Sequence, residues 1–548
     1  MKVTTTESNL TTKQIISSLI LISVVSILLK LYLVDFSIPV NSDNLEYALF
    51  AIAHTNGDFS QSSHRGMGWS YFVSIFFNFV DSNNFLDYSN ILRGLSMAIS
   101  VSSISMMYLL GRKFFDGRYS LLLASLFAFE PHLNYNSGLG LAEPFFILAL
   151  IGTFYFILNK DSRFVIISLL LAGIVYWSRL NGFFAFFVIS VIYFITMRKS
   201  PHFFRNYVIG LGIFILIISP ILIERDAQFG DPFYSVYSGT IFSGDIETIY
   251  SEVGTNETYS ASQFIEENGI GSFIQTFILN GFYNTFSLLS ILSFPYLFIL
   301  IPFGILFSFR AFDQNPNFIK ANWIFLSISI LFMILIIAVV PERRFLFHIL
   351  PFLMIFSVIP VQRVIEYGLS TFSFSRKQKD IFLVSVIIIL IILSGFFTLR
   401  YEKLDTILEN EKLAFSNFAL NNLDGTVLRD FGGGLDYITY LKITNPIDNF
   451  KNYKINQNMD SGYQFNDISL PSKNNLNEFL IYAEDKNLKY IISNEKNSNI
   501  NPLIDELYYT HNSYSYLEKI FDSNDVGYKK LKLKVFEINY KKFNEIND

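Results

Sequence analysis

Long runs of apolar residues alternate with short polar segments through the first 400 residues of the chain. A helix that crosses the hydrocarbon core of a bilayer needs about 20 consecutive apolar residues. By that measure the pattern predicts about eleven transmembrane helices. Their expected ranges are 14–34, 89–110, 119–133, 142–158, 164–180, 182–197, 206–223, 287–309, 321–340, 345–361 and 381–399.

The pattern changes after residue 400. The tail is rich in Asn and Lys, and it mixes helix-like runs with strand-like runs such as TVLRDF, LKYIIS and LKLKVFEINY. In the last of these, lysines alternate with apolar residues, as is typical of a half-buried strand. We therefore expect an α-helical polytopic membrane module over 1–400, with large outer loops at 35–88 and 224–286. A C-terminal α/β domain over 401–548 should follow it.

The composition supports a membrane protein. Hydrophobic residues make up 51% of the 548 residues and charged residues 16%, whereas soluble domains carry about 25% charged residues. A net charge of −5 gives no electrostatic basis for binding nucleic acid. The absence of cysteine excludes disulfides and cysteine-ligated metals.

Lys and Arg concentrate in alternate connections between the predicted spans, and such connections face the cytoplasm. This bias predicts a multi-pass protein of the cell membrane with a cytoplasmic N-terminus and an extracytoplasmic tail. The outer connections before the tail then hold only a few basic residues. These are Arg65, Arg179, Arg225, Arg343 and Arg344.

Arginines on the outer side run against the insertion bias, and charge near a membrane interior is rare unless it is paired or functional. Guanidinium groups bind phosphate in a bidentate manner, so an anionic ligand would explain the group. The candidates for that role are Arg65, Arg179, Arg343 and Arg344, together with Arg93 in the outer half of the second span. The alternative is that they reach lipid headgroups or pair with Glu130, Glu143 and Glu342.

The loop 35–88 is long for a connection between helices, which is typical of functional loops. It should contain two short surface helices, the first with Leu45, Leu49, Ile52 and Ala53 inward, and the second over 69–79. In the first helix, Asp43 and Glu46 are three residues apart and share one face. Glu143 starts a later span. Asp43 as a helix cap and Glu143 as a dipole partner are the structural alternatives.

The order of these features resembles the GT-C glycosyltransferases that use polyprenyl-phosphate sugars, including protein O-mannosyltransferases and the aminoarabinose transferase of lipid A. The resemblance covers roughly residues 14–400. Its matching segments are DFSIPVNSDNLEYALFAIAHTNGDF, NILRGLSMAIS, LLGRKFFDGRYSLLLASLFAF, Glu143-Pro144, Arg179 to Gly182, and RRFLFHILPF. There are two departures. His64-Arg65-Gly66 stands where the family often has His-Pro or Lys-Pro, and the Trp-Trp-Asp-Tyr-Gly signature of oligosaccharyltransferases is absent.

The resemblance implies transfer of a sugar from a polyprenyl-phosphate donor to a hydroxyl of a glycan, lipid or protein acceptor, with inversion, at the outer face. Such a reaction needs a carboxylate general base and positive charge where the phosphate departs. On this hypothesis Asp43 is the base, Glu46 or Glu143 positions the acceptor or a cation, and the arginines hold the phosphate.

Two points stay open at this stage. Imidazole with carboxylate can bind a divalent ion, so His64 and His348 are candidate metal ligands, although no tight ligand spacing is present. The alternative function is a transporter or flippase of a lipid-linked glycan intermediate. A transporter is expected to have repeated halves and charged sites near the bilayer midplane, and the sequence shows no internal repeat.

Overall fold

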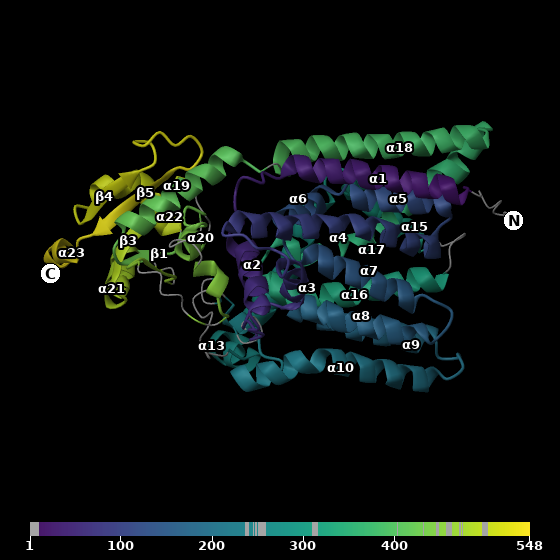
Figure 1. Cartoon of the computed structure of the whole chain (residues 1–548), viewed down its shortest axis with the longest axis horizontal. Helices are drawn as coiled ribbons and strands as arrows, with labels where there is room; N and C mark the ends of the chain where they lie inside the picture. Colours follow the sequence, from purple (N-terminus) through teal and green to yellow (C-terminus); the bar gives the residue numbers. More distant parts are fainter. Residues whose placement is uncertain are drawn as a thin grey trace.

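The structure is a computed structural model, and it describes residues 10–235, 240–244, 246, 249, 259–309, 316–402, 404–430, 432–444, 449–455, 457, 463–470, 473, 475–495 and 502–547. Helices form a long bundle, and a sheet with its own helices packs at one end of it (Figure 1). The N-terminus lies at the opposite end of the bundle (Figure 1).

The bundle contains six described helices that are long and apolar enough to cross a membrane, or seven with a bent pair. Four shorter apolar helices, of 10–17 residues, lie among the described residues too. The chain is thus a multi-pass membrane protein, and the number eleven stays a prediction. The main bundle helices are α1 (Thr12–Leu33), α4 (Phe85–Phe114), α5 (Gly117–Ala128), α6 (Pro131–Leu139), α7 (Glu143–Ile157), α8 (Phe164–Ser178), α9 (Phe184–Thr196), α10 (Phe203–Phe229), α14 (Asn280–Ser293), α15 (Leu297–Ser308), α16 (Pro316–Val339), α17 (Leu350–Arg363) and α18 (Arg376–Phe397).

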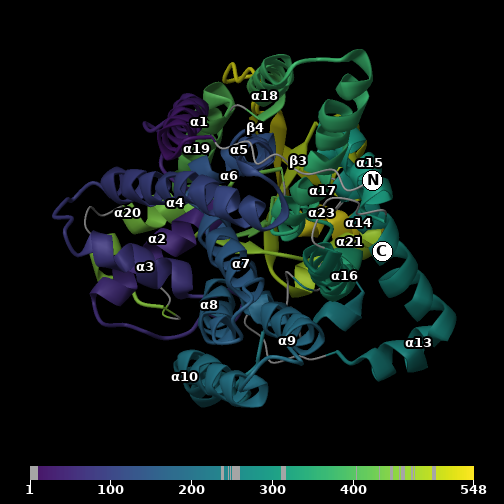
Figure 2. The same cartoon turned by 90° about the vertical axis from the view of Figure 1, so that its right-hand side faces the viewer.

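Neighbouring helices follow the order α4, α7, α8 and α10 across the bundle, as the end-on view in Figure 2 shows. One predicted span is interrupted. The expectation of a continuous helix over 287–309 is wrong, because the chain bends by 114° between Ser293 and Leu297. Pro295 lies in this break. Proline removes a backbone donor and disfavours helical geometry in the residue before it.

The two short helices predicted in the first loop are confirmed as α2 (Ser42–Thr55) and α3 (Gly68–Phe77). Both lie at the sheet end of the bundle (Figure 1). The four inward positions expected on α2 are buried. Six further residues of this helix are buried as well. Helix α2 is therefore covered on most sides and does not have the single inward face that the sequence predicted.

The tail forms a five-stranded sheet in the order β2-β1-β3-β5-β4. Strand β1 is parallel to β2 and β3, whereas β5 is antiparallel to β3 and β4. The strands are β1 (Thr426–Leu428), β2 (Asn466–Ile468), β3 (Leu488–Asn494), β4 (Leu517–Asp522) and β5 (Leu533–Ile538). The helices are α19 (Thr406–Asn422), α20 (Ile438–Thr444), α21 (Leu476–Asp485), α22 (Pro502–Thr510) and α23 (Tyr540–Asn547).

This α/β unit is joined to the first loop by apolar and polar contacts. Ile443 and Phe450 share one buried apolar cluster with residues of α2, α3 and α4. The Asp58 carboxylate accepts a hydrogen bond from the Ile455 amide at 2.7 Å. Burial of apolar side chains from both parts is the main favourable term for such packing.

Close helix packing in the bundle depends on Gly304 of α15. A Cβ atom there would clash with the backbone carbonyl of Phe356 in α17. We expect Gly304→Ala to lower the free energy of unfolding by about 1–3 kcal/mol, the range for overpacking. Gly212→Ala in α10 is the matched control, since its Cβ would meet open space. Thermal unfolding in detergent tests this, and equal unfolding temperatures for the two variants would contradict it.

Candidate active site

Charged side chains from four segments meet where the first loop covers the bundle. Asp43 and Glu46 come from α2, and His64 and Arg65 from the connection to α3. Arg179 is the C-cap residue of α8, and Arg344 lies in the short helical turn Arg343–Leu346 before α17. Five of the nine site residues predicted from the sequence therefore form one connected set of ion pairs, and Arg179 forms a separate pair with Glu143.

Asp43 is held by two guanidinium groups. One carboxylate oxygen accepts a hydrogen bond from Arg65 at 2.5 Å, and the other pairs with Arg344. Burial alone would raise the pKa of Asp43, but the charges of Arg65 and Arg344 outweigh it and hold the pKa well below its ordinary value. The carboxylate is therefore ionised and neutralised by its two partners.

Arg65 also bridges to the second carboxylate of α2. Its Nε atom pairs with Glu46, and the His64 Nε2 atom lies 3.3 Å from the same Glu46 oxygen. Burial opposes ionisation of Glu46, yet Arg65 and then His64 lower its pKa. The Arg65 side chain is 14% exposed and the Glu46 side chain 37% exposed, so solvent and salt screen this bridge only in part.

Glu143 lies behind Arg179. Its carboxylate is 3.2 Å from the arginine Nη1 atom, and 3% of the side chain is exposed. Glu143 does not line the cavity described below. This ion pair places a negative charge beside the Arg179 guanidinium group, although neither carboxylate oxygen of Glu143 has a hydrogen-bond partner among the described residues.

Two glycines bring the loop that carries Arg65 against the end of α8. A Cβ atom at Gly66 or Gly68 would lie within 3.0 Å of backbone atoms of Trp177 or Ser178. This approach explains why His64-Arg65-Gly66 replaces a proline-containing pattern here, since proline at position 66 would carry side-chain atoms into the same space. The fully buried Arg225 braces the same loop by donating to the Ser62 carbonyl at 2.6 Å.

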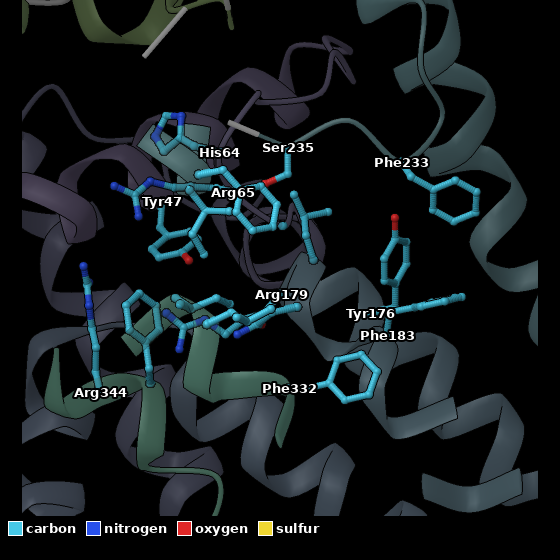
Figure 3. A pocket seen from close by; sticks show the side chains of 18 residues that line it. Tyr47, His64, Arg65, Tyr176, Arg179, Phe183, Phe233, Ser235, Phe332 and Arg344 are labelled. Carbon is cyan, nitrogen blue, oxygen red and sulfur yellow. The ribbon is translucent and has the colours of Figure 1, made fainter. Parts of the chain in front are cut away.

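A cavity of about 440 Å³ opens beside this cluster. Arg65, Arg179 and Arg344 lie on one side of it, and Tyr176, Phe183, Phe233 and Phe332 lie on the other (Figure 3). The remaining wall is mostly apolar, with Leu180, Leu335, Ile336 and Phe345. The arrangement suits an amphipathic ligand with an anionic head and an apolar chain.

A second cavity, of about 360 Å³, lies on the side of the α/β unit. Asp43 and Arg344 line it together with residues of the tail. Arg344 therefore contributes to both cavities, and the Asp43–Arg344 pair stands between them.

Two of the predicted arginines lie elsewhere. Arg343 is exposed and does not line either cavity. Arg93 donates to backbone carbonyls of Ile38 at 2.6 Å and Asp35 at 3.2 Å, so it fixes the start of the first loop. The prediction that these two bind an anion in this site is not supported by the geometry, because neither side chain reaches the cavity.

The metal hypothesis for His64 and His348 also lacks a ligand set. His348 packs against Phe184 and Phe146 and lines neither cavity. Within the part of the chain that the structure describes, no group of three or more His, Asp or Glu side chains is placed to hold a metal. Guanidinium groups occupy the oxygens of Asp43 where a cation would bind, so these residues do not fit a divalent ion.

The sequence did not reveal the aromatic wall or the tail residues of the site. Tyr47, Tyr176, Phe183 and Phe233 are indistinguishable in sequence from the many other aromatic residues of the spans. Pairing of outer arginines with Glu143 and Glu342 was the alternative to ligand binding, and it is confirmed for Arg179 and Arg344. Ligand binding by the same arginines stays a prediction, and the pairing leaves room for it because both side chains also line the cavity.

Several solved structures share this fold. The oligosaccharyltransferase of Archaeoglobus fulgidus in its apo form matches with 14% identity and a TM-score of 0.56, over 88% of this chain and 70% of that one. ArnT from Cupriavidus metallidurans bound to undecaprenyl phosphate matches with 9% identity and a TM-score of 0.52, over 95% of this chain and 98% of that one. No protein-family model and no curated protein sequence matches the chain.

These two proteins are GT-C glycosyltransferases. The chain therefore has the GT-C fold, as the order of acids and arginines predicted. At such low identity the likeness establishes the fold, and the activity has to be argued from the site itself.

Removal of Arg65 tests the charge cluster. We expect Arg65→Gln to lower the free energy of unfolding by about 1–3 kcal/mol at pH 7, because it leaves a buried charged partner unsatisfied. Arg163→Gln is the matched control. Arg163 pairs with Asp161 at the surface, where ion pairs contribute little, so its loss should not change the unfolding temperature measurably.

The same variant has a pH signature. In the native protein the pKa of Asp43 is lowered, so its stabilising contribution is complete above the ordinary carboxyl pKa of about 3.9 and is lost as the pH falls further. Without Arg65, burial dominates at Glu46 and favours the protonated acid. The deficit of Arg65→Gln relative to the native protein should therefore shrink between pH 7 and pH 4.5 in thermal unfolding. A deficit that grows over this interval would contradict the assignment.

Proposed function

We propose that the protein is a membrane glycosyltransferase that moves a sugar from a polyprenyl-phosphate donor to an acceptor hydroxyl, with inversion, on the outer face of the membrane. One observation carries the proposal. An apolar, aromatic-lined cavity ends at three arginines, and the two that pair with Asp43 hold a carboxylate directly beside it. The apolar cavity suits an isoprenoid chain, the arginines suit a phosphate, and the carboxylate suits a general base.

Arg65, Arg179 and Arg344 would bind the donor phosphate. Each guanidinium group can offer two parallel N–H donors to phosphate oxygens. The same groups stabilise the charge that develops on the phosphate as it leaves, which is the largest contribution in many transfer reactions. The structures of ArnT with undecaprenyl phosphate and of the archaeal AglB with dolichol-phosphate support a polyprenyl-phosphate ligand for this fold.

Asp43 would be the general base. Its oxygen takes the proton of the acceptor hydroxyl, the acceptor oxygen attacks the anomeric carbon, and the bond from that carbon to the phosphate oxygen breaks. The leaving phosphate keeps the electron pair. Attack from the side opposite the phosphate inverts the anomeric centre.

The ion pairs of Asp43 also suggest how the base is activated. In the structure the charges of Arg65 and Arg344 outweigh burial and lower the pKa of Asp43, which makes it a weak base. The phosphodiester of the donor carries one negative charge, as a carboxylate does, and its two free oxygens would compete with Asp43 for the same guanidinium groups. The basicity of Asp43 then rises only when the donor is bound, which limits transfer to the loaded enzyme.

Glu46 and Glu143 would act through the arginines. Glu46 fixes Arg65 through a hydrogen bond, and the charge of Glu143 balances that of Arg179. A flippase of a lipid-linked intermediate remains the alternative function, and it would bind the same headgroup without chemistry. The elements that carry Asp43, Glu46 and Arg65 favour the enzyme, because α2 and α3, with the connection between them, lie at the sheet end of the bundle (Figure 1).

Replacement of the base tests the chemistry. With radiolabelled polyprenyl-phosphate sugars and the purified full chain, Asp43→Asn should reduce sugar transfer by about 10²–10⁴-fold, the usual contribution of a positioned base. Donor binding should persist, because the arginines remain. Full transfer activity in Asp43→Asn would refute the role. Tight donor binding by the native protein without turnover of any sugar would favour the flippase.

Replacement of the arginines tests the donor site. Arg344→Gln should weaken binding of polyprenyl phosphate at least about tenfold, as expected when about 1.4 kcal/mol of a charge-assisted contact is lost. Arg343→Gln, next to it but outside the cavity, should leave the affinity within about twofold. Scintillation proximity binding measures both. If both variants lost the same affinity for polyprenyl phosphate, the arginine that lines the cavity would have no special role in binding, which would contradict the proposal.

A further inference from the structure

The second cavity lies where the α/β unit meets the end of the bundle. Its lining comes from α2, α6, the tail and the turn before α17. The residues are Asn41, Ser42, Asp43, Asn44, Tyr135, Leu139, Leu141, Arg344, Leu404, Glu409, Lys412 and Asp436. Carboxylates, amides and one ammonium group thus surround a space of about 360 Å³.

The tail side of this cavity lies next to the topological switch point of the sheet. Strands β1 and β3 are adjacent and parallel. The chain leaves β1 through α20 toward β2, and it leaves β3 through α22 toward β4 on the other side. Outside the carboxyl ends of two such strands a crevice forms, and ligands of open α/β sheets bind in it.

A glycine turn after β1 shapes this crevice. The Asp430 carboxylate accepts hydrogen bonds from the amides of Gly432 at 2.8 Å and Gly434 at 2.7 Å, and from the Asn494 side chain at the end of β3 at 2.7 Å. Gly433 has a φ of +84°, and a Cβ atom there would lie 3.0 Å from Lys412 Nζ. A side chain at that position would displace the lysine, so glycine keeps the space for it.

Lys412 is fixed between two acids. Its Nζ atom lies 3.1 Å from Glu409 and 3.0 Å from Asp436. Glu409 also accepts a hydrogen bond from the Tyr437 hydroxyl at 2.7 Å. Only 15% of the Lys412 side chain is exposed, so the ammonium group has one defined direction and not the range of a surface lysine.

These groups suit a polyhydroxylated ligand. A hydroxyl both donates and accepts, so it can satisfy a carboxylate on one side and an ammonium or amide group on the other. Peptides are usually recognised through a strand edge or an apolar groove, whereas this wall is built from helix and turn side chains. The volume is within the range of pockets for small ligands.

We propose that this cavity is the acceptor site, that the acceptor is a saccharide, and that Lys412, held by Glu409 and Asp436, selects the hydroxyl that reaches Asp43. The inference rests on the proposed glycosyl transfer and assigns the acceptor class to it. Arg344 separates the two cavities, so a saccharide bound here meets Asp43 from the side away from the donor phosphate. Lys412 is a specificity-determining residue in this arrangement, and Asp43 performs the proton transfer.

The test measures saccharide binding separately from donor binding. The full chain in lipid nanodiscs is titrated with methyl glycosides of hexoses and pentoses and with short oligosaccharides, followed by saturation-transfer NMR. We expect at least one saccharide to bind, and Lys412→Met and Asp436→Asn each to weaken it tenfold or more. Lys489→Met is the matched control, since Lys489 pairs with Asp424 in the same unit and does not line the cavity.

Several outcomes would overturn the inference. These are absence of binding by every saccharide, equal binding by Lys412→Met and the native protein, and binding of a Ser/Thr-containing peptide that depends on Lys412. Lys412→Arg is a second variant for the case in which Lys412→Met does not fold. It keeps the positive charge and should therefore bind the saccharide with at least part of the native affinity. Polyprenyl phosphate affinity should be unchanged in Lys412→Met. Failure of the donor proposal would instead appear as unchanged polyprenyl phosphate affinity in Arg179→Gln, whose side chain lines only the first cavity, with saccharide binding intact.

Discussion

The site depends on one arrangement, the carboxylate of Asp43 shared by Arg65 and Arg344. These three side chains come from α2, from the connection to α3 and from the turn before α17, positions up to 301 residues apart in the chain. Each of the three charged groups loses hydration in this largely buried position, and this desolvation costs free energy unless an opposite charge lies beside it. The first loop and the bundle therefore have to fold together for any of them to be satisfied. The proposed catalytic carboxylate and the proposed phosphate site are therefore produced by the same requirement.

The shared carboxylate also divides the space around it. On the bundle side the cavity is aromatic and apolar, and on the tail side it is lined by amides, acids and Lys412. A ligand with an isoprenoid chain gains from the first environment, because burial of apolar surface is favourable. A ligand rich in hydroxyls gains from the second. The two substrates of the proposed transfer are thus separated by chemistry before they meet at Asp43.

The sequence predicted the parts of the fold that local patterns determine. Apolar runs located the bundle, the spacing of Leu45, Leu49 and Ile52 predicted that α2 is a helix, and the 43/46 spacing placed two carboxylates on one face. The sequence did not predict features that depend on contacts between distant parts of the chain. Nothing near Arg343 and Arg344 distinguishes the exposed residue from the one that reaches Asp43, since they occupy neighbouring positions of one short turn. The break near Pro295 could not be seen in the hydrophobic pattern, because residues 287–309 form one continuous apolar run. A single proline within such a run does not by itself predict that the span is broken.

The tail was the least predictable part of the site for a related reason. Its glycine triplet invites a phosphate-loop interpretation, which the spacing does not support. In the structure two of these glycines donate to Asp430, and Gly433 leaves room for Lys412. Their purpose is visible only when β1, β3 and α19 are assembled against α2. A crevice at the end of parallel strands is a common place for a ligand, and here it lies beside Asp43, the proposed base. The α/β unit therefore forms one wall of the proposed acceptor site.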